Sequence, residues 1–289
     1  MSTCKTICIY HGNCADGFGA AWAVRQSGVD ADFVPGVYQT DPPDVTGARV
    51  IMVDFSYRRP VMEELGKKAQ SILVLDHHKS AAEDLAEYPE PPCDISELRG
   101  WLPYSGIYAR FDMERSCAIL AWEHFHTGDP PQLLRHVEDR DLWRFALPGT
   151  REIQAAVFSY PYDFDVWACL MGTPLDDLRR EGEAIERKHH KDIAELVKVC
   201  QRYMNIGGYS MPVASLPYTL TSDAGRLMAI NDDSQIAACY WDTAEARVFS
   251  LRSPDGGPDV SGIAKLYGGG GHAHAAGFAV PRGHALAQE

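Results

Sequence analysis

Residues 71–80 have the sequence SILVLDHHKS, in which a short apolar run ends in three polar residues, Asp76, His77 and His78. A run of Ile, Leu and Val of this length is typical of a strand that is buried on both faces. An acidic residue followed by two histidines is an unusual end for such a strand, because neither a helix cap nor a packed core requires it. The stretch therefore predicts a buried strand with chemically active side chains at its carboxyl end.

Two earlier stretches repeat this pattern. KTICIY at 5–10 leads into His11, and RVIMV at 49–53 leads into Asp54. Another short strand is predicted at 31–34, and helical patterns are found at 18–24 and 60–70. Strands that alternate with helices predict an α/β fold, here a doubly wound parallel sheet flanked by helices in the N-terminal part of the chain.

The remaining chain predicts a long connector helix and a smaller C-terminal α/β domain. The longest helical pattern, at 174–203, is heavily charged and is followed by Gly207-Gly208, a typical helix end. Ser222 and Asp259 are predicted helix N-caps. Shorter patterns predict helices at 115–127 and 130–140, strands at 211–216, 235–241 and 246–252, and a loop at 88–105. We therefore expect a first domain at 1–150, a helical connector at 151–206 and a second domain at 207–289.

The composition limits the classes of partner. The chain has 289 residues, 45% of them hydrophobic and 23% charged, which suits folded domains and excludes an intrinsically disordered chain. With 27 Lys and Arg against 40 Asp and Glu, the net charge is −13. A long nucleic acid is therefore not expected as a partner, whereas a small anion could bind beside a metal ion.

No sequence pattern indicates export or membrane insertion. The beginning, MSTCKTICIY, lacks the long apolar stretch of a signal peptide, and no stretch approaches the roughly 18 apolar residues of a membrane helix. The eight cysteines form no CxxC pair of the kind that holds structural zinc. We therefore expect a cytoplasmic protein with reduced thiols and no membrane partner.

The polar residues at the strand ends are expected to meet. In an open parallel sheet, ligands bind beyond the carboxyl ends of the strands, where His11, Asp54 and the triplet at 76–78 would converge. A single Asp after a strand is common in loops, and a single His there is usually a surface residue. The prediction of a site therefore depends on the combination.

Further acidic residues can join this site. Asp16 lies at the start of the helix after His11, and Asp139 and Asp141 lie in VEDRDLW at 137–143. Mixed histidine and carboxylate ligands suit Mn²⁺, Fe²⁺ or Zn²⁺. Two such ions about 3.5–4 Å apart are the usual arrangement for hydrolysis of phosphoesters.

Five motifs resemble those of the DHH phosphoesterase superfamily. They are VLDHHKS at 74–80, IYHGNCADGFGAA at 9–21, VDFS at 53–56, VEDRDLW at 137–143 and GGGGHAHAAGF at 268–278. The last is similar to the glycine-rich motif of the DHH-associated domain. Together they cover most of the chain in the family's order. The resemblance implies a metal-binding catalytic domain at 1–150 and a DHH-associated substrate-binding domain at 207–289. It is strongest to members of the nanoRNase type, which degrade short oligoribonucleotides and linear dinucleotides.

The resemblance also implies roles for four of the predicted ligands. His11 would bind a first Mn²⁺, and Asp54 would bridge two ions. Asp16 and His77 would hold the second ion together with one carboxylate of VEDRDLW. Mg²⁺, Zn²⁺ and Fe²⁺ remain alternatives to Mn²⁺.

The choice within VEDRDLW, and the roles of the neighbours of His77, follow from the same resemblance. Asp139 is preferred to Asp141 as a ligand, because Asp141 precedes a Leu-Trp pair typical of packing. Asp76 would orient His77 and fix its tautomer. His78 would face the substrate as a phosphate ligand or as a proton donor to the leaving oxygen.

The first motif departs from the family pattern. The family has two Asp with one residue between them, and Asp16 matches the second of these. The first falls on Cys14, so that Cys14 and Asn13 both remain candidates for its place. A thiolate there would favour a softer ion such as Zn²⁺, whereas an amide would weaken the site.

The second domain is expected to bind substrate. Its candidates are Gly269, Gly270, Gly271, His272 and Arg252. Glycines let a backbone approach a ligand closely, and their N–H groups can form an anion-binding nest. Arg252 follows a predicted strand and could contact a phosphate through two hydrogen bonds.

Two histidines and two tryptophans are expected to have structural roles. His124 and His126, at the end of a predicted helix, are expected at the surface. Trp143 and Trp167 are expected to pack rather than to stack on nucleobases.

These observations predict a metal-dependent phosphodiesterase. It would hydrolyse short oligonucleotides or dinucleotides, cyclic or linear, to nucleoside 5′-monophosphates. One alternative is a phosphomonoesterase or pyrophosphatase that acts on a small bisphosphate such as pAp. Another is a nucleotide-binding sensor with a degenerate metal site, which the altered first motif favours. A homodimer is compatible with the sequence.

Overall fold

The computed structural model describes residues 5–37, 40–91 and 105–288. The chain divides into two compact units, Met1–Ile185 (unit 1) and Glu186–Glu289 (unit 2). Cys4, Cys93 and much of the loop predicted at 88–105 lie outside the described residues.

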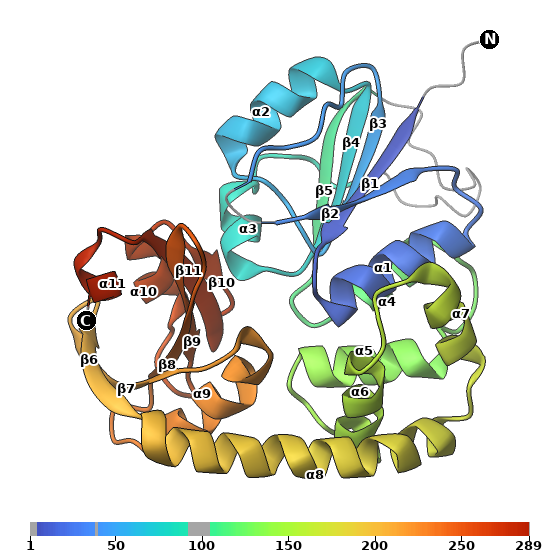
Figure 1. The fold of residues 1–289 in the computed structure, drawn as a ribbon. Helices are drawn as coiled ribbons and strands as arrows, with labels where there is room; N and C mark the ends of the chain where they lie inside the picture. Colours follow the sequence, from blue (N-terminus) through green and yellow to red (C-terminus); the bar gives the residue numbers. More distant parts are fainter. Residues whose placement is uncertain (1–4, 38–39, 92–104, 289) are drawn as a thin grey trace. The chain divides into compact units, whose positions relative to one another are not determined.

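Unit 1 is built on a five-stranded parallel sheet with the strand order β2-β1-β3-β4-β5 (Figure 1). The strands are β1 (Thr6–His11), β2 (Asp32–Gly36), β3 (Arg49–Val53), β4 (Ser71–Asp76) and β5 (Gly106–Phe111). The order reverses between β1 and β3, which makes this pair the topological switch point where ligands bind in open parallel sheets.

Helices cover both faces of this sheet. They are α1 (Ala15–Gln26), α2 (Arg59–Lys68) and α4 (Cys117–Phe125). Since successive side chains of a strand point to opposite faces, Met52 and Val74 pack in one cluster with α2, whereas Ile51 and Leu73 pack with α1 and α4. Each such buried side chain contributes roughly 1.5–3 kcal/mol. The predicted doubly wound α/β fold is thus confirmed.

A second helical layer packs outside α1 and α4. It consists of α5 (Gln132–Asp141), α6 (Thr150–Phe158) and α7 (Phe164–Gly172), while the short α3 (Lys79–Asp84) follows β4. Phe18 of α1 and Ile119 of α4 share one core cluster with Val137 of α5 and with Trp167 of α7. Trp167 is fully buried and packs, as predicted.

The longest helix, α8 (Leu175–Cys200), begins in unit 1 and ends in unit 2. The helix predicted at 174–203 is too long, because Arg202 already begins a strand. Gly207 and Gly208 do not end the helix. Both have positive φ, 61° and 88°, and form the tight turn of the next hairpin, where the matching backbone twist favours glycine. The division into three segments at 150 and 206 stays a prediction.

Unit 2 contains a six-stranded mixed sheet with the order β10-β11-β9-β8-β7-β6. The strands are β6 (Arg202–Ile206), β7 (Tyr209–Ser215), β8 (Ala237–Asp242), β9 (Ala246–Arg252), β10 (Gly270–Gly271) and β11 (Ala275–Pro281). On one face, α9 (Thr221–Ile230) packs with the end of α8. On the other pack α10 (Ser261–Leu266) and α11 (Ala285–Gln288). The smaller C-terminal α/β fold is therefore present.

Neither of the two predicted N-caps occupies the N-cap position of its helix. Ser222 lies inside α9, so its predicted capping role is wrong. Asp259 lies one residue before Val260, the N-cap of α10, so its predicted position is also wrong, although its Oδ1 accepts hydrogen bonds from Ser261 N at 2.9 Å and Ser261 Oγ at 2.5 Å.

The end of α4 is more buried than predicted. Nε2 of His124 is buried without a hydrogen bond among the described residues. Nε2 of His126 lies 2.8 Å from Ala23 O, and its ring stacks on Trp122 with centroids 3.9 Å apart. Both histidines therefore help to pack α4 instead of lying free at the surface.

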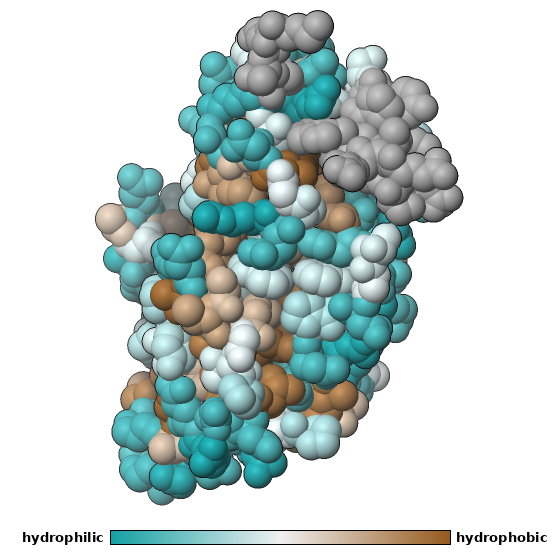
Figure 2. Space-filling view, turned by 90° about the vertical axis from the view of Figure 1, so that its right-hand side faces the viewer, coloured by the Kyte–Doolittle hydropathy of each residue, from teal (hydrophilic) through white to brown (hydrophobic). Residues whose placement is uncertain are grey.

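In the part of the chain that the structure describes, no helix is both long and apolar enough to cross a lipid bilayer. Hydrophilic and hydrophobic residues interleave on the face shown in Figure 2.

Candidate metal centre

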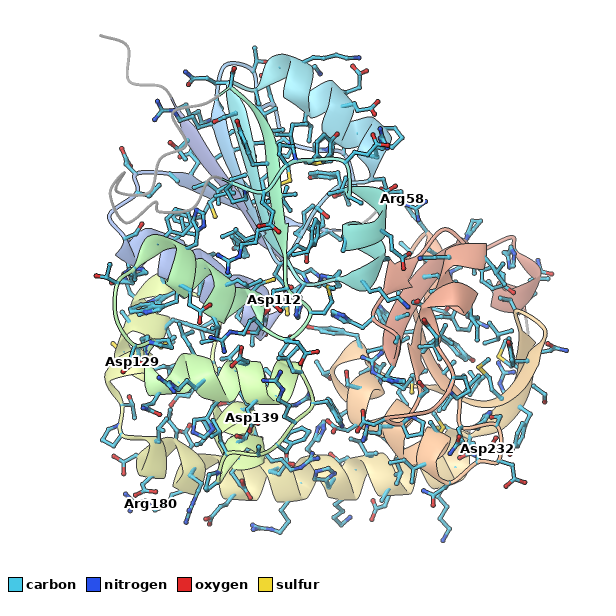
Figure 3. The ribbon with its side chains drawn as sticks, turned by 180° about the vertical axis from the view of Figure 1, so that it is seen from behind. Arg58, Asp112, Asp129, Asp139, Arg180 and Asp232 are labelled. Carbon is cyan, nitrogen blue, oxygen red and sulfur yellow. The ribbon has the colours of Figure 1, made fainter. Side chains whose placement is uncertain are left out.

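Polar side chains leave the carboxyl edge of the unit 1 sheet from three adjacent strands. His11 is the last residue of β1, Asp54 directly follows β3, and Asp76 is the last residue of β4. The strands are neighbours in the order β1-β3-β4, so their ends lie side by side at the switch point. Asp112, labelled in Figure 3, marks the same edge at the end of β5. The fold thus brings together the residues that the sequence placed at strand ends.

Asp54 lies at the centre of this cluster. Its Oδ2 is 3.2 Å from His11 Nδ1. Its Oδ1 is 3.3 Å from His77 Nε2 and 3.8 Å from His78 Nδ1. Only 1% of Asp54 is exposed. The two oxygens of one buried carboxylate thus face different histidines, an arrangement that would let it be shared by two metal ions.

The backbone of Asp54 is strained. Its φ of 55° lies in the left-handed region, which few residues other than glycine adopt, although Asp tolerates it better than most. Its N–H still donates to Leu75 O at 3.1 Å, which ties the end of β3 to β4. Such a conformation costs roughly 1–2 kcal/mol, and proteins keep it most often where it directs a functional side chain.

Three carboxylates surround Nε2 of His77. Asp141 Oδ2 lies 3.5 Å away and Asp16 Oδ2 lies 3.8 Å away, in addition to Asp54 Oδ1. His77 itself is 2% exposed. One imidazole nitrogen and three carboxylates around a common point form a typical donor set for a divalent cation.

The first turn of α4 fixes Asp16. Its Oδ2 accepts a hydrogen bond from Cys117 N at 2.6 Å, and its Oδ1 accepts one from Ala118 N at 2.9 Å. The N-terminus of a helix attracts negative charge, so α4 holds this carboxylate beside His77. Asp16 itself comes from the first turn of α1, two residues after the N-cap Cys14.

Charge crowding shifts the pKa values of these groups. Burial, together with the carboxylates of Asp141 and Asp54, raises the pKa of Asp16 well above its usual range. Burial also raises the pKa of Asp141. Burial opposes charge on Asp54, but the hydrogen bond from His11 and the nearby imidazoles hold its pKa well below the usual range. Burial likewise opposes charge on His77, but its carboxylate neighbours raise its pKa. A divalent cation among these groups would relieve the repulsion between the carboxylates.

The donor atoms fit two metal positions that share Asp54. One set is His11, Asp54 and His78, and the other is Asp16, Asp54, His77 and Cys117, with the ligand atoms of each set within 4.8 Å of one another. Asp54 Oδ1 is buried and accepts no hydrogen bond among the described residues, an orphaned acceptor that a cation would satisfy. The residues therefore fit a metal. Cys117 is the member of these sets that the sequence did not indicate, because it starts a helix rather than follows a strand.

Asp76 orients His78 rather than the ring of His77. Its Oδ1 accepts hydrogen bonds from His77 N at 2.8 Å and His78 N at 3.2 Å and lies 2.7 Å from His78 Nδ1. Its Oδ2 accepts one from Ser56 Oγ at 3.2 Å. Asp76 was predicted to fix the tautomer of His77. Instead it faces His78, whose Nδ1–H points to the Asp76 carboxylate.

The structure favours Asp141 over the predicted Asp139 as the ligand from VEDRDLW. Both carboxylate oxygens of Asp139 accept hydrogen bonds, from Ala146 N at 2.8 Å, Leu147 N at 3.0 Å and Thr150 Oγ1 at 2.5 Å. Asp139 is labelled in Figure 3, among the helices of unit 1. Residues two apart on an α-helix point in nearly opposite directions, so only one of the two can face His77.

Neither Asn13 nor Cys14 belongs to the two sets of possible metal ligands, so neither replaces the acidic residue that the first motif lacks. Asn13 is exposed and has a positive φ of 57°. Cys14 is half-buried, and its pKa is raised well above the usual range by burial and by Asp54, Asp141 and Asp16. Cys14 therefore lies near the acidic cluster.

In unit 2, Arg252 is held at the end of β9. Its Nη1 donates to Ser250 Oγ at 2.9 Å, and its Nη2 donates to Ser222 Oγ at 2.8 Å. Gly225 of α9 makes room for this side chain, because a Cβ there would lie 2.9 Å from Arg252 Cγ. The guanidinium is thus positioned by serine hydroxyls, and its contact with a phosphate stays a prediction.

The glycine run of unit 2 has a structural role of its own. A Cβ on Gly269 would lie 2.0 Å from Gly277 O, so only glycine fits beside β11. The amide of Gly269 donates to Ala264 O at the end of α10, which leaves it unsuited to the predicted anion nest. Gly270 and Gly271 form β10, and His272 donates its amide to Ala275 O at 2.8 Å. Substrate binding by these residues stays a prediction.

No protein-family model matches the chain. The chain is 28% identical over 298 residues to an uncharacterized protein of Acanthamoeba polyphaga mimivirus, and the match covers 94% of this chain and 67% of that relative.

Three solved structures show weaker likenesses. A pGpG-specific phosphodiesterase from Vibrio cholerae has 16% identity and a TM-score of 0.47, covering 96% of this chain and 93% of its own. An exopolyphosphatase-related protein from Bacteroides fragilis has 12% identity and a TM-score of 0.47, covering 95% and 86%. RecJ in complex with Mn²⁺ from Thermus thermophilus has 14% identity and a TM-score of 0.44, covering 96% and 49%. Identities of 12–16% and TM-scores of 0.44–0.47 are weak likenesses.

Proposed function

We propose that this chain is a metal-dependent phosphodiesterase that hydrolyses short oligonucleotides or dinucleotides to nucleoside 5′-monophosphates. The observation that carries the proposal is the position of Asp54, a buried carboxylate at the switch point whose two oxygens face different histidines. The resemblance to the DHH phosphoesterases supports the same class of reaction, because its motifs contain these residues.

The ligands divide between two metal positions. His11 lies beside Asp54 in one, and Asp16 and His77 lie beside Asp54 in the other. The Nδ1 of His78 is bound to Asp76, and His78 is therefore not counted as a ligand. Histidine and carboxylate donors suit Mn²⁺, Zn²⁺ or Fe²⁺, and Mg²⁺ where oxygen ligands prevail. When bound, such ions would lower the pKa of a water molecule and neutralise charge on the phosphate.

His78 and Asp76 act on the substrate in this proposal. Asp76 accepts the Nδ1–H of His78, so the opposite nitrogen, Nε2, can contact a phosphate oxygen or give a proton to the leaving 3′ oxygen. Burial opposes charge on His78, but the carboxylate of Asp76 raises its pKa, which favours the protonated ring.

A short substrate is favoured over a long one. The net charge of −13 disfavours a long polyanion, whereas one or two phosphates beside the metal positions need no wider basic surface. Arg252, already oriented by Ser222 and Ser250, is the proposed contact for a further phosphate.

A panel of substrates tests this proposal. Metal-stripped protein would be supplied with Mn²⁺, Mg²⁺ or Zn²⁺ and offered pApA, pGpG, a short RNA, cyclic dinucleotides, pAp and pyrophosphate, with products separated by chromatography. Metal-dependent release of mononucleotides from the linear dimers is the expected result. Turnover of pAp or pyrophosphate alone would assign a phosphatase instead. Tight nucleotide binding without turnover would favour a sensor.

A further inference from the structure

We propose that Cys117 is a thiolate ligand of the metal position formed by Asp16, Asp54 and His77, and that this position prefers Zn²⁺ or Co²⁺ to Mn²⁺ or Mg²⁺. The inference rests on the proposed function only in requiring that a metal ion occupies this position. It concerns which ion is bound and through which atom.

The first support is geometric. The sulfur of Cys117, Nε2 of His77 and one oxygen each of Asp16 and Asp54 lie within 4.8 Å of one another. A four-coordinate ion with bonds of about 2.0–2.3 Å separates its ligand atoms by about 3.3–3.8 Å, and Asp141, whose Oδ2 lies 3.5 Å from His77 Nε2, would supply the fifth ligand that zinc also accepts. His77 Nε2 is already 3.3 Å from Asp54 Oδ1 and 3.8 Å from Asp16 Oδ2. The set therefore needs little movement to close around one ion.

The second support is the orphaned acceptor in this set. Asp54 is 1% exposed, and its Oδ1 accepts no hydrogen bond among the described residues. Leaving a buried carboxylate oxygen unsatisfied is unfavourable, so this atom indicates a ligand at the point that it shares with the other three.

The third support is the way in which α4 fixes Cys117. Its N–H donates to Asp16 Oδ2 at 2.6 Å, so the residue that supplies the sulfur also orients a second ligand. Ser116 caps the same turn by accepting a hydrogen bond from Ile119 N at 3.4 Å, and Ser116 N donates to Glu138 Oε1 at 3.2 Å. The sulfur is therefore held in place by the start of the helix.

The simpler explanation is that Cys117 is only a small apolar residue in the core, which is the usual role of a buried cysteine. Cys8 of β1 fits that description, since burial alone raises the pKa of its thiol. Cys117 differs, because its sulfur lies within 4.8 Å of ligand atoms of Asp16, Asp54 and His77. Its sulfur thus faces charged ligands, and soft thiolates select ions such as Zn²⁺ and Co²⁺ over Mg²⁺ and Mn²⁺.

Cobalt absorption tests the proposal independently of activity. Co²⁺ would be titrated into metal-stripped full-length protein, and the near-ultraviolet charge-transfer band from sulfur to cobalt would be recorded. We expect the band in the wild type, in Cys14→Ser and in Cys169→Ser, whose cysteine is exposed on α7, and its loss in Cys117→Ser. A band that disappears in Cys14→Ser and persists in Cys117→Ser would overturn the proposal.

Metal competition provides the second measurement. Cys117→Ser should weaken Zn²⁺ binding by about tenfold or more and leave Mn²⁺ binding nearly unchanged. Equal effects on both ions would contradict a thiolate ligand. If Cys117→Ser fails to fold, Cys117→Asp should still bind Co²⁺, without the sulfur band.

The outcomes separate this inference from the proposed function. Co²⁺ binding without a sulfur band in the wild type would overturn the thiolate ligand but leave the phosphodiesterase proposal intact. A failure of the wild type to bind Co²⁺, Zn²⁺ or Mn²⁺ would overturn both.

Discussion

At the residue scale, the carboxylates of Asp139 and Asp141 in α5 differ in what they contact. Asp139 binds two backbone amides and a hydroxyl, whereas Asp141 lies 3.5 Å from His77. Asp139→Ala leaves two backbone amides without their acceptor, whereas Thr150 Oγ1 can still donate to Leu147 O at 3.2 Å, and should lower the free energy of unfolding by about 2 kcal/mol or more. Asp141→Asn should leave stability nearly unchanged and weaken metal binding by about tenfold or more.

Urea denaturation and metal titration of both variants would check this prediction. Asp129→Asn is a matched control, since its side chain is 93% exposed and pairs only at the surface with Arg135. A loss of metal binding without a loss of stability in Asp139→Ala would reverse the assignment.

Much of the candidate site could be predicted from the sequence at this scale. His11, Asp54 and His77 follow apolar strands, and the topology of a parallel sheet brings such ends together. The choice of Asp141 could not be predicted, because it depends on how α5 is rotated about its axis. Cys117 could not be predicted either, because its place in the site depends on the packing of α4 against α1.

At the scale of single elements, the buried His124 makes the stability of α4 depend on pH. Burial, with a contribution from Arg110, lowers the pKa of His124 to about 4, against about 6.5 in an unfolded chain. Between these values the unfolded state binds the proton and the folded state does not, so stability falls as the pH falls. From pH 7 to pH 5 the wild type should lose about 2 kcal/mol more than His124→Gln, which cannot titrate.

Urea denaturation at several pH values would measure this difference. His190→Gln serves as the control, because the side chain of His190 is 48% exposed on α8. Identical pH dependence in the wild type and in His124→Gln would contradict the account of α4.

The contact between β10 and β11 predicts a second effect at this scale. Gly269→Ala would place a Cβ 2.0 Å from Gly277 O, so the strand pair must shift, which should cost about 2 kcal/mol or more. Gly283→Ala is the control, since no atom lies within 4 Å of its Cβ position. Thermal melts of both variants would check the difference, and equal melting temperatures would show that position 269, just before β10, does not need glycine.

Elements were predictable where they carry a strong apolar pattern. The strands at 49–53 and 246–252 have the predicted bounds. The predicted helical connector at 151–206 contains α6 and α7, but the local pattern did not predict these two helices one by one, because their apolar residues pack against other helices. It also extended α8 over β6, because charged and apolar residues continue without interruption from one element into the next.

At the scale of the whole molecule, the metal centre belongs to unit 1 and its stability should depend on the ion. The crowded carboxylates around His77 repel one another, and a ligand that binds only the folded state stabilises it by about 2.7 kcal/mol at one hundred times its dissociation constant. Adding Zn²⁺ or Mn²⁺ to stripped protein should therefore raise the melting temperature of the wild type. Calorimetry should show a much smaller rise for Asp54→Asn, and an equal rise would place the ion elsewhere.

The two units could be predicted only in part. The change from a parallel α/β pattern to a separate set of strands predicts two folded parts. The structure places the division at Ile185 and Glu186, inside α8. A continuous helix offers no composition change at that point, so the boundary depends on which side chains of α8 pack on each unit.

The central claim is that Asp54 organises metal ions for phosphodiester hydrolysis. The most direct measurement is the release of mononucleotide from pGpG by metal-stripped protein, before and after addition of Mn²⁺ or Zn²⁺, in the wild type and in Asp54→Asn. We predict metal-dependent release by the wild type and at least about a hundredfold slower release by the variant, because Asp54 is shared by both metal positions. Equal release by the two proteins, or release that needs no metal, would contradict this account.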